Sequence, residues 1–437
     1  YNGINRQALS YVAQTATQDN RTSQLVVEGS LSGALKFLQS PFASAPAALS
    51  VGVDYRRETA DTRVSGNYAS GDLIYYGQGF DIPNKSYDVK EIYGEFKMPL
   101  VQDKPWIQAL DIEAGYRYSH YSTSGGVSAF KVGGDYAPVE GLKFRANFQR
   151  SVRAPNLYEL YLPRTAATGS LQSDPCAGAG VTGSTATMCL AQGVTQNELA
   201  RGLVPQPTAG QINIFTGGNT ALKPEKSNTI TVGMVLEPRR IRGLSLTVDY
   251  YDIKISNAIV YNSPTTVLDQ CFGSNNPANA YCQRSHRNPL DGSLSGDTTV
   301  GVDTLYDNVA VMRTRGLDFG LNYHRGSLSG FHYSFGFAGT YVFKNFQQID
   351  GGTYECAGKF GAQCDMPTPK WKHVATFAFG IKNVDLTTRW RLIGGVKEDE
   401  YTDIQKSHIP AYHYFDETAN IRVNDKFTFS FGVLNMF

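Results

Sequence analysis

Apolar and polar residues alternate in repeated runs from one end of this chain to the other. In one run, Leu110, Ile112, Ala114, Tyr116 and Tyr118 alternate with polar residues or glycine. Successive side chains of a strand point to opposite faces, so such a run predicts a strand with one apolar and one polar face. No stretch shows a sustained helical period, and we expect an all-β chain with few helices. The same alternation recurs at 142–149, 244–250, 331–337, 384–392 and 427–433.

About fifteen strands can be placed along the chain, and the connections between them alternate in length. The brief connections lie near 138–141, 238–243, 325–330, 382–385 and 423–426. The long ones lie at 61–86, 153–225, 259–307 and 346–370, and the short connection at 122–126 breaks the rule. Short periplasmic turns and long extracellular loops are typical of outer-membrane barrels. The expected strands are 4–17, 23–38, 47–60, 87–98, 107–121, 126–137, 141–152, 226–237, 242–258, 308–324, 328–345, 371–382, 384–398, 408–422 and 425–435.

Composition supports a chain with one face in lipid. Charged residues make up 18% of the sequence, against about 25% in an average soluble domain. No uninterrupted apolar run is long enough for a transmembrane helix, which takes about 18 residues or more. The net charge of +1 argues against a nucleic-acid partner. We therefore predict a transmembrane antiparallel up-and-down β-barrel with long extracellular loops. A water-soluble sandwich is the alternative, but no linker divides this many strands into separate sandwiches.

The alternation also assigns residues to the two faces of the predicted wall. Polar residues on one register would line the lumen: Asp111, Glu113, Arg117, Lys143, Arg145, Asp249, Asp318, Asp385, Arg389 and Arg391. Aromatic residues near strand ends would form the interface girdles on the lipid face: Tyr116, Tyr118, Tyr121, Tyr250, Tyr341, Trp371 and Trp390.

The six cysteines all lie in the long connections. Their proximity within separate loops favours three local disulfides among the fifteen possible connectivities. Such bridges indicate an oxidising compartment and brace the loops, either for binding or only against proteolysis. The expected pairs are Cys176 with Cys189, Cys271 with Cys282, and Cys356 with Cys364.

Enzyme chemistry finds no support in the sequence. The seven histidines are scattered, and no nucleophile-elbow, zinc-protease or phosphate-loop motif occurs. No CxxC or histidine cluster accompanies the cysteines, so a metal site is not indicated. We expect neither an enzyme nor a bound cofactor.

Two segments resemble signatures of TonB-dependent receptor barrels. Residues 150–163, RSVRAPNLYELYLP, are similar to the family's RAPN(L/I)xEL(F/Y) signature, and residues 218–233, GNTALKPEKSNTITVG, are similar to its N-x-x-L-x-P-E-x-S motif. Near the end, GVLNMF at 432–437 looks like the family's NLF. Individually these motifs could simply shape the long loop. The matching positions are Arg153, Ala154, Pro155, Asn156, Glu159, Leu222, Pro224 and Glu225.

The resemblance implies active uptake by a TonB-dependent transporter in the outer membrane of a Gram-negative bacterium. In this family, the ligand binds the loops and an N-terminal plug from outside, and TonB then acts on the plug. No plug or TonB box is visible here. Such barrels have about 22 strands, so we expect residues 1–437 to be part of a barrel whose first strands, last strand and plug are missing. Strand parity leaves Phe437 on the outer side.

The expected partners are outer-membrane lipid, the TonB complex and a small-molecule or oligosaccharide ligand. A siderophore, an oligosaccharide or cobalamin remains open, and a passive porin or a structural or surface-receptor barrel is the alternative function. Aromatic residues in the outer loops can stack on sugar rings or aromatic chelators, although they can equally pack the loops together. These candidates for ligand contact are Tyr158, Tyr161, Tyr261, Tyr281, Tyr306 and Tyr354.

Overall fold

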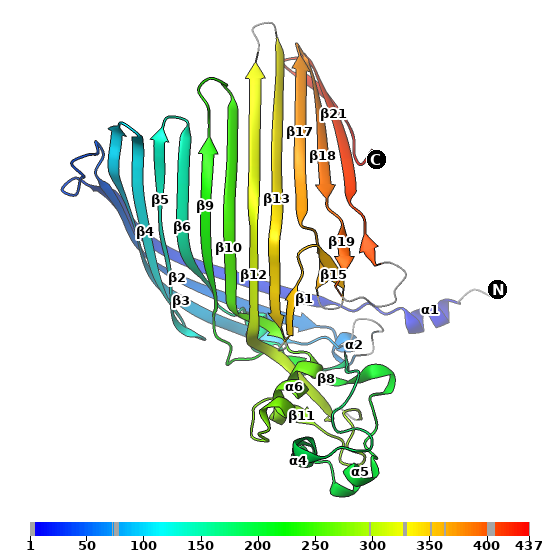
Figure 1. Cartoon of the computed structure of the whole chain (residues 1–437). Coiled ribbons are helices and arrows are strands. Elements are labelled where there is room, and N and C mark those ends of the chain that lie inside the picture. The colour runs from blue at the N-terminus through cyan, green and yellow to red at the C-terminus, as the bar shows by residue number, and fades with distance from the viewer. Residues whose placement is uncertain are drawn as a thin grey trace.

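The computed structural model describes residues 5–71, 73, 78–296, 299–326, 330–349, 352–361, 364–399 and 407–436. An eighteen-stranded sheet dominates it. Most of its strands pair with their neighbours in the chain as an antiparallel meander, the wall (Figure 1). The wall strands are β1 (Gln18–Leu35), β2 (Ala47–Val64), β3 (Ile82–Lys104), β4 (Ile107–Tyr121), β5 (Gly125–Val139), β6 (Leu142–Arg153), β9 (Glu225–Leu236), β10 (Leu244–Tyr261), β12 (Gly301–Gly326), β13 (Phe331–Ile349), β17 (Trp371–Ile381), β18 (Val384–Ile393), β21 (Tyr412–Asn424) and β22 (Phe427–Val433).

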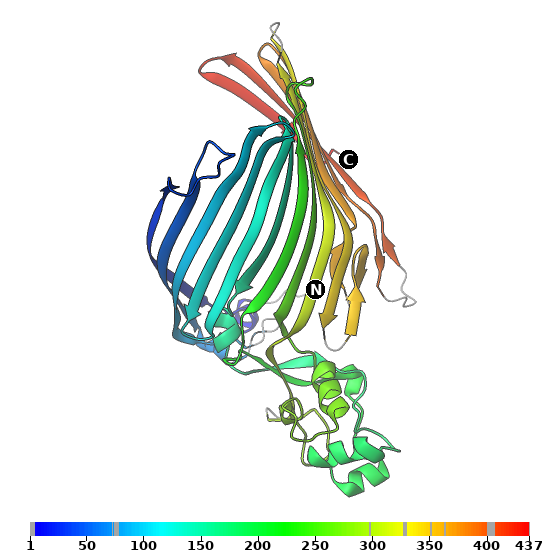
Figure 2. The same cartoon turned by 60° about the vertical axis from the view of Figure 1, so that its left-hand side comes forward.

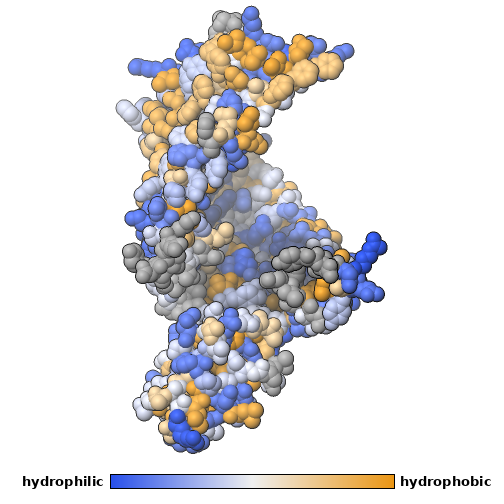
Figure 3. All heavy atoms as spheres, turned by 90° about the vertical axis from the view of Figure 1, so that its right-hand side faces the viewer, coloured by the Kyte–Doolittle hydropathy of each residue, from blue (hydrophilic) through white to orange (hydrophobic). Residues whose placement is uncertain are grey.

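The wall curves strongly (Figure 2), and its concave side surrounds a hollow (Figure 3). In the described part of the chain, β1 pairs within the wall only with β2, and β22 only with β21. The sheet is therefore an open part of a barrel wall in these residues, with β1 and β22 at its edges. Figure 3 looks into the hollow and shows many hydrophilic residues inside it.

Short and long connections lie at opposite ends of the wall. The turn end includes the tight connections at 105–106, 140–141, 382–383 and 425–426. The loop end carries 154–224 and 262–300, which lie together below the wall in Figure 1. The predicted odd-even rule is confirmed, including the short exception between β4 and β5. Smaller strands at the loop end are β14 (Gly352–Glu355), β15 (Lys359–Gly361), β16 (Asp365–Thr368), β19 (Val396–Glu398) and β20 (His408–Ile409).

The strand register places all ten predicted lumen residues on one face of the wall. Several of them pair there, as Arg145 does with Asp249 through nitrogen–oxygen distances of 2.8 and 2.7 Å. The opposite face is apolar and open. Val232 is 50% exposed and Phe431 is 61% exposed. A contiguous exposed apolar surface of this kind fits lipid rather than water.

Two predictions about the wall were wrong. The strand expected at 4–17 is instead the helix α1 (Arg6–Val12), because the Asn5 side chain caps the backbone N–H of Ala8 and residues 6–9 favour a helix. Tyr121 does not belong to the outer girdle. It pairs with Val89 on the face that carries Glu91 and Arg117, because its odd number puts it on the polar register. Phe437 lies outside the described residues.

The helices of the described chain are short and lie outside the wall. Besides α1, they are α2 (Gly66–Ala69), α3 (Leu157–Tyr161), α4 (Gly183–Ala191), α5 (Gln196–Arg201) and α6 (Pro264–Ser274). Within the described residues, none of the helices has the length and apolar character that crossing a bilayer would take.

Val232 provides a test of the outward face. Val232 lies within the apolar band of β9, and we expect Val232→Arg to destabilise the protein in lipid vesicles by about 2–4 kcal/mol. Thr231 is the matched control, since it lines a small pocket of about 160 Å³ on the concave face. Thr231→Arg should cost far less. Denaturant unfolding in vesicles measures both variants, and equal losses would contradict the assignment of the faces.

Candidate functional site

The two longest loops fold together into a lobe, which we define as the described residues of 154–224 and 262–300 (Figures 1 and 2). Besides α3 to α6, it contains β7 (Thr165–Ser170), β8 (Gln211–Gly217), β11 (Ser285–His286) and two turns of 3₁₀ helix, η1 (Thr208–Gly210) and η2 (Cys282–Arg284). β8 and β11 both pair with the start of β12. Val267, Leu268 and Val302 are fully buried in one of its apolar clusters. The lobe thus has a core of its own, attached to the wall through β12.

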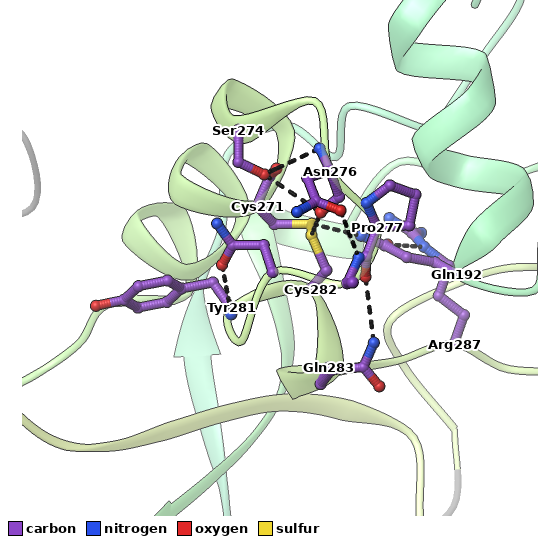
Figure 4. Close-up of a disulfide and its surroundings, with 11 residues drawn as sticks. Gln192, Cys271, Ser274, Asn276, Pro277, Tyr281, Cys282, Gln283 and Arg287 are labelled. Carbon is purple, nitrogen blue, oxygen red and sulfur yellow. Dashed lines mark hydrogen bonds between the residues drawn. A yellow bond between two sulfur atoms is a disulfide. The ribbon is translucent and has the colours of Figure 1, made fainter.

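All three predicted disulfides are present. Cys176–Cys189 and Cys271–Cys282 brace the lobe, and Cys356–Cys364 closes the connection between β13 and β17. Figure 4 shows that Gln192 joins two parts of the lobe. Its side-chain amide donates to Cys271 Sγ at 3.1 Å, and its carbonyl oxygen accepts from Arg287 Nε at 2.8 Å.

A buried ion pair also ties the two loops together. Arg287 from the second loop donates twice to Asp174 of the first, at 2.7 and 2.8 Å, and both side chains are 1% exposed. The same guanidinium also donates to the Gly292 carbonyl oxygen at 2.9 Å. Removing one member of such a pair leaves an uncompensated buried charge, which is strongly destabilising.

The motif residues meet where the lobe joins the wall. Arg153 ends β6 and donates to Glu225 at the start of β9, at two distances of 2.7 Å. It also donates twice to Glu159 in α3 at 3.0 Å. Glu225 accepts the backbone N–H of Ile259 at 2.7 Å as well. One guanidinium therefore holds two strands and a helix at a fixed distance from one another.

The other motif residues complete this junction. Asn156 caps α3, because its side chain accepts from the Glu159 N–H and the Glu159 carboxylate accepts from the Asn156 N–H, both at 2.8 Å. Pro155 and Pro224 are buried, and Ala154 is half-buried. Leu222 packs with Leu160 and Ile259. These motifs therefore form the base on which the first loop stands.

The structure separates the six candidate tyrosines into two groups. Tyr261 and Tyr306 stack with ring centroids 3.7 Å apart. Tyr161 and Tyr306 pack against the same apolar cluster, and Tyr158 and Tyr261 line a common cavity. Tyr281 instead packs within the lobe, and Tyr354 lies on β14. Four of the six are thus brought together at the junction.

The cavity beside these tyrosines has a volume of about 720 Å³. The cavity is lined by residues of β1, β2, the connection after β2, α3 and the lobe strands β7 and β8. Tyr68 and Tyr87 were missed as candidates, although Tyr68 lies in a predicted long connection. The aromatic and polar residues that line the cavity include Tyr68, Tyr87, Tyr158, Tyr261, Gln18, Asn20, Arg21, Glu58 and Gln78.

Burial keeps Tyr158 and Tyr261 of this cavity neutral. Burial raises the pKa of Tyr261 far above its ordinary value, and a hydrogen bond with Tyr306 raises it further. Burial also raises the pKa of Tyr158. These rings can therefore stack on a ligand or exchange hydrogen bonds through neutral hydroxyls. In the described part of the chain, no three His, Cys, Asp or Glu side chains gather as a metal site requires.

The buried ion pair gives a prediction for the lobe. Arg287→Met removes the partner of Asp174, and we expect the lobe to lose about 3–5 kcal/mol of local stability. Hydrogen exchange should rise in α4, α5 and α6 but not in the wall strands. Arg201 is an exposed control at the end of α5, and Arg201→Met should leave exchange unchanged. Unaltered exchange in the Arg287 variant would contradict the structural role of the pair.

Comparisons with known proteins agree with this architecture. A family model described as "TonB dependent receptor-like, beta-barrel" matches residues 1–436. A mutant ferric enterobactin receptor from Pseudomonas aeruginosa, in complex with enterobactin, is similar in structure with a TM-score of 0.61 at 15% identity. That match covers 96% of this chain and 49% of that receptor. No curated protein sequence matches significantly.

Two further solved structures are similar. The siderophore receptor PirA from Acinetobacter baumannii gives a TM-score of 0.58 at 13% identity, with 95% of this chain and 51% of that one covered. A double mutant of the Serratia marcescens hemophore receptor HasR, in complex with its hemophore HasA and heme, gives 0.54 at 14% identity, with 96% and 56% covered.

At these identities the structural likeness establishes the fold alone, and this chain spans about half the length of the first of these receptors. The matches are to transport receptors and not to enzymes. Because the family model covers nearly every residue, this chain belongs to the family of TonB-dependent receptor-like β-barrels.

Proposed function

We propose that this protein takes up a scarce ligand across the outer membrane of a Gram-negative bacterium in a TonB-dependent manner. The family supports TonB-dependent uptake in general, and it implies the outer-membrane location. The observation that supports ligand capture by this chain is the cavity of about 720 Å³ at the loop end of the hollow. A ligand bound in this cavity would lie between the long loops and the interior of the barrel.

The chemistry of the cavity favours a ligand with rings and hydroxyl groups. Four tyrosines contribute aromatic surface, while Gln18, Asn20 and Gln78 offer amide donors and acceptors. Arg21 and Glu58, which have opposite charges, also line the cavity. A catecholate chelator or an oligosaccharide can stack and hydrogen-bond in such a site. We propose the siderophore class first, since several similar receptors are described as binding siderophores.

We further propose that the chain works within a longer receptor that has an N-terminal plug and a TonB box. This chain matches 49% of the length of the ferric enterobactin receptor, so that receptor is about twice as long as its matched part. In this arrangement, the plug fills the hollow and the concave charged residues contact it. Arg153 fixes the first loop on the wall, so the cavity keeps its shape while the plug moves.

Energy coupling separates this function from a passive porin. In cells that produce the full-length receptor, uptake of a radiolabelled ferric catecholate siderophore should exceed the level in cells without the gene. Deletion of tonB should reduce this uptake to background, because the plug then stays in place. Uptake that persists without TonB would refute active transport and favour a pore.

The tyrosines of the cavity give a more specific prediction. The double variant Tyr158→Ala and Tyr261→Ala removes two aromatic surfaces of the cavity. Stacking between aromatic rings contributes on the order of 1 kcal/mol per contact. We therefore expect a loss of at least about tenfold in affinity for the transported ligand, measured by fluorescence quenching on the purified receptor.

Tyr354→Ala is the matched control for that experiment. Tyr354 is an aromatic residue of the same loop end, but it is not among the residues that line the cavity. Its loss should change the affinity by less than about twofold. Equal effects from the control and the double variant would argue against the cavity as the ligand site.

A further inference from the structure

Towards the loop end, the outward face of the wall changes from apolar to basic on five neighbouring strands. On β9, the outward residues Met234, Val232 and Ile230 are followed towards the loop end by Asn228 and Lys226. On β10, the apolar series ends at Tyr250 and gives way to Asp252 and Lys254. β12 changes in the same way after Leu317. The transition is therefore a property of the surface and not of one strand.

Strand register places these basic residues close together on the outward face of the wall. Lys254 lies opposite Asn228 on one side and Arg313 on the other. Arg315 lies opposite both Asp252 and Lys344. Asn228 in turn lies opposite Arg150 on β6, whose Nε donates to it at 2.9 Å. We name this group the basic belt: Arg150, Lys226, Lys254, Arg313, Arg315 and Lys344.

The belt has more positive than negative charge. Asp252 accepts from Arg313 at 2.8 and 2.6 Å and lies 2.9 Å from Arg315 Nε. Glu355 on β14 faces the same side, and its carboxylate accepts two backbone N–H groups, those of Asn345 and Ala357. Six cations against these two carboxylates leave a formal net charge of +4. Lys226 and Lys254 are exposed.

The surface next to the belt on its turn-end side is apolar and aromatic. Ile230 is 45% exposed, Phe148 is 40% exposed and Tyr341 is 36% exposed. The belt also contacts aromatic rings, since Arg150 lies 5.3 Å from the ring centroid of Phe130 and Lys344 Nζ lies 5.1 Å from that of Phe346. Cations directly beyond an aromatic girdle lie at the depth of lipid headgroups, where anionic groups attract them.

We propose that the basic belt binds the phosphate groups of anionic lipids in the leaflet around the loop end. This inference rests on the outer-membrane placement in the proposed function, but not on which ligand is transported. The arginines held by Asp252 give a fixed centre for one phosphate. The lysines on either side add charge and reach towards the headgroups. A free phosphate would lack the acyl chains that can contact the apolar surface on the turn-end side of the belt.

The test uses the full-length receptor, delipidated in neutral detergent, and native mass spectrometry. The triple variant Lys226→Gln, Lys254→Gln and Lys344→Gln removes three charges of the belt. We expect it to bind diphosphoryl lipid A at least about tenfold more weakly than the wild type, given the contribution of each lysine near an anionic surface. Dephosphorylated lipid A should bind both proteins equally and more weakly. Inorganic phosphate at the same concentration should not displace the diphosphoryl lipid.

A second triple variant controls for charge and folding. Lys143→Gln, Lys382→Gln and Lys426→Gln remove the same charge from the concave face and the turn end, so they should change lipid binding by less than about twofold. Equal losses in the two triple variants, or displacement of the lipid by inorganic phosphate, would overturn the proposal. Lipid binding is measured without transport, so a failure of TonB-dependent uptake would leave this result interpretable.

Discussion

Backbone hydrogen bonding between neighbouring strands is the constraint on which the rest of this structure depends. A chain that crosses hydrocarbon with strands must pair its amide groups within the wall, because lipid offers them no partner. In the described part of the chain, every wall strand from β1 to β22 pairs antiparallel with the wall strands before and after it. Once that ladder is set, each side chain has only two directions, and the alternation of the sequence decides which residues meet lipid and which face the hollow.

The long loops are stabilised by other interactions than the strands of the wall. They cannot rely on the ladder, and they form a lobe with its own apolar clusters, two disulfides and the buried pair of Asp174 and Arg287. The junction around Arg153 connects this lobe to β6 and β9 through charge-assisted hydrogen bonds. A stiff lobe on a stiff wall allows the cavity between them to keep its shape, which favours binding because little order is lost when a ligand enters.

Sequence reasoning recovered the wall because its signal is local. The strands of the wall, the two ends of the barrel and the three disulfides follow from alternation and from the short separation of the cysteines. The stretch at 4–17 failed because a local cap at Asn5 outweighed weak alternation. Tyr121 lies on the concave face, because the strand register and not aromatic character decides the direction of a side chain. Motif positions such as Arg153 and Glu225 were found, but their joint clamp was not, since it depends on residues 72 apart in the chain.

The cavity could not be predicted from the sequence for the same reason. Its lining combines β1 and β2 with α3 and the lobe, and only the folded wall brings these segments together. Tyr158 and Tyr261 could be picked out because they are aromatic and lie in or beside long loops. Tyr87 carries no such mark, because it lies on the polar register of an ordinary strand. Contacts that span the hollow leave no periodic trace in a sequence.

The two-faced wall is tested most directly by spin labels placed singly at each position from 229 to 236 on β9 in lipid vesicles. If the even positions contact lipid, collisions with oxygen dissolved in the bilayer should be frequent at 230, 232, 234 and 236 and rare at the odd positions between them. A polar relaxation agent should show the inverse pattern. Equal access of both reagents to even and odd positions would contradict a wall with one face in lipid.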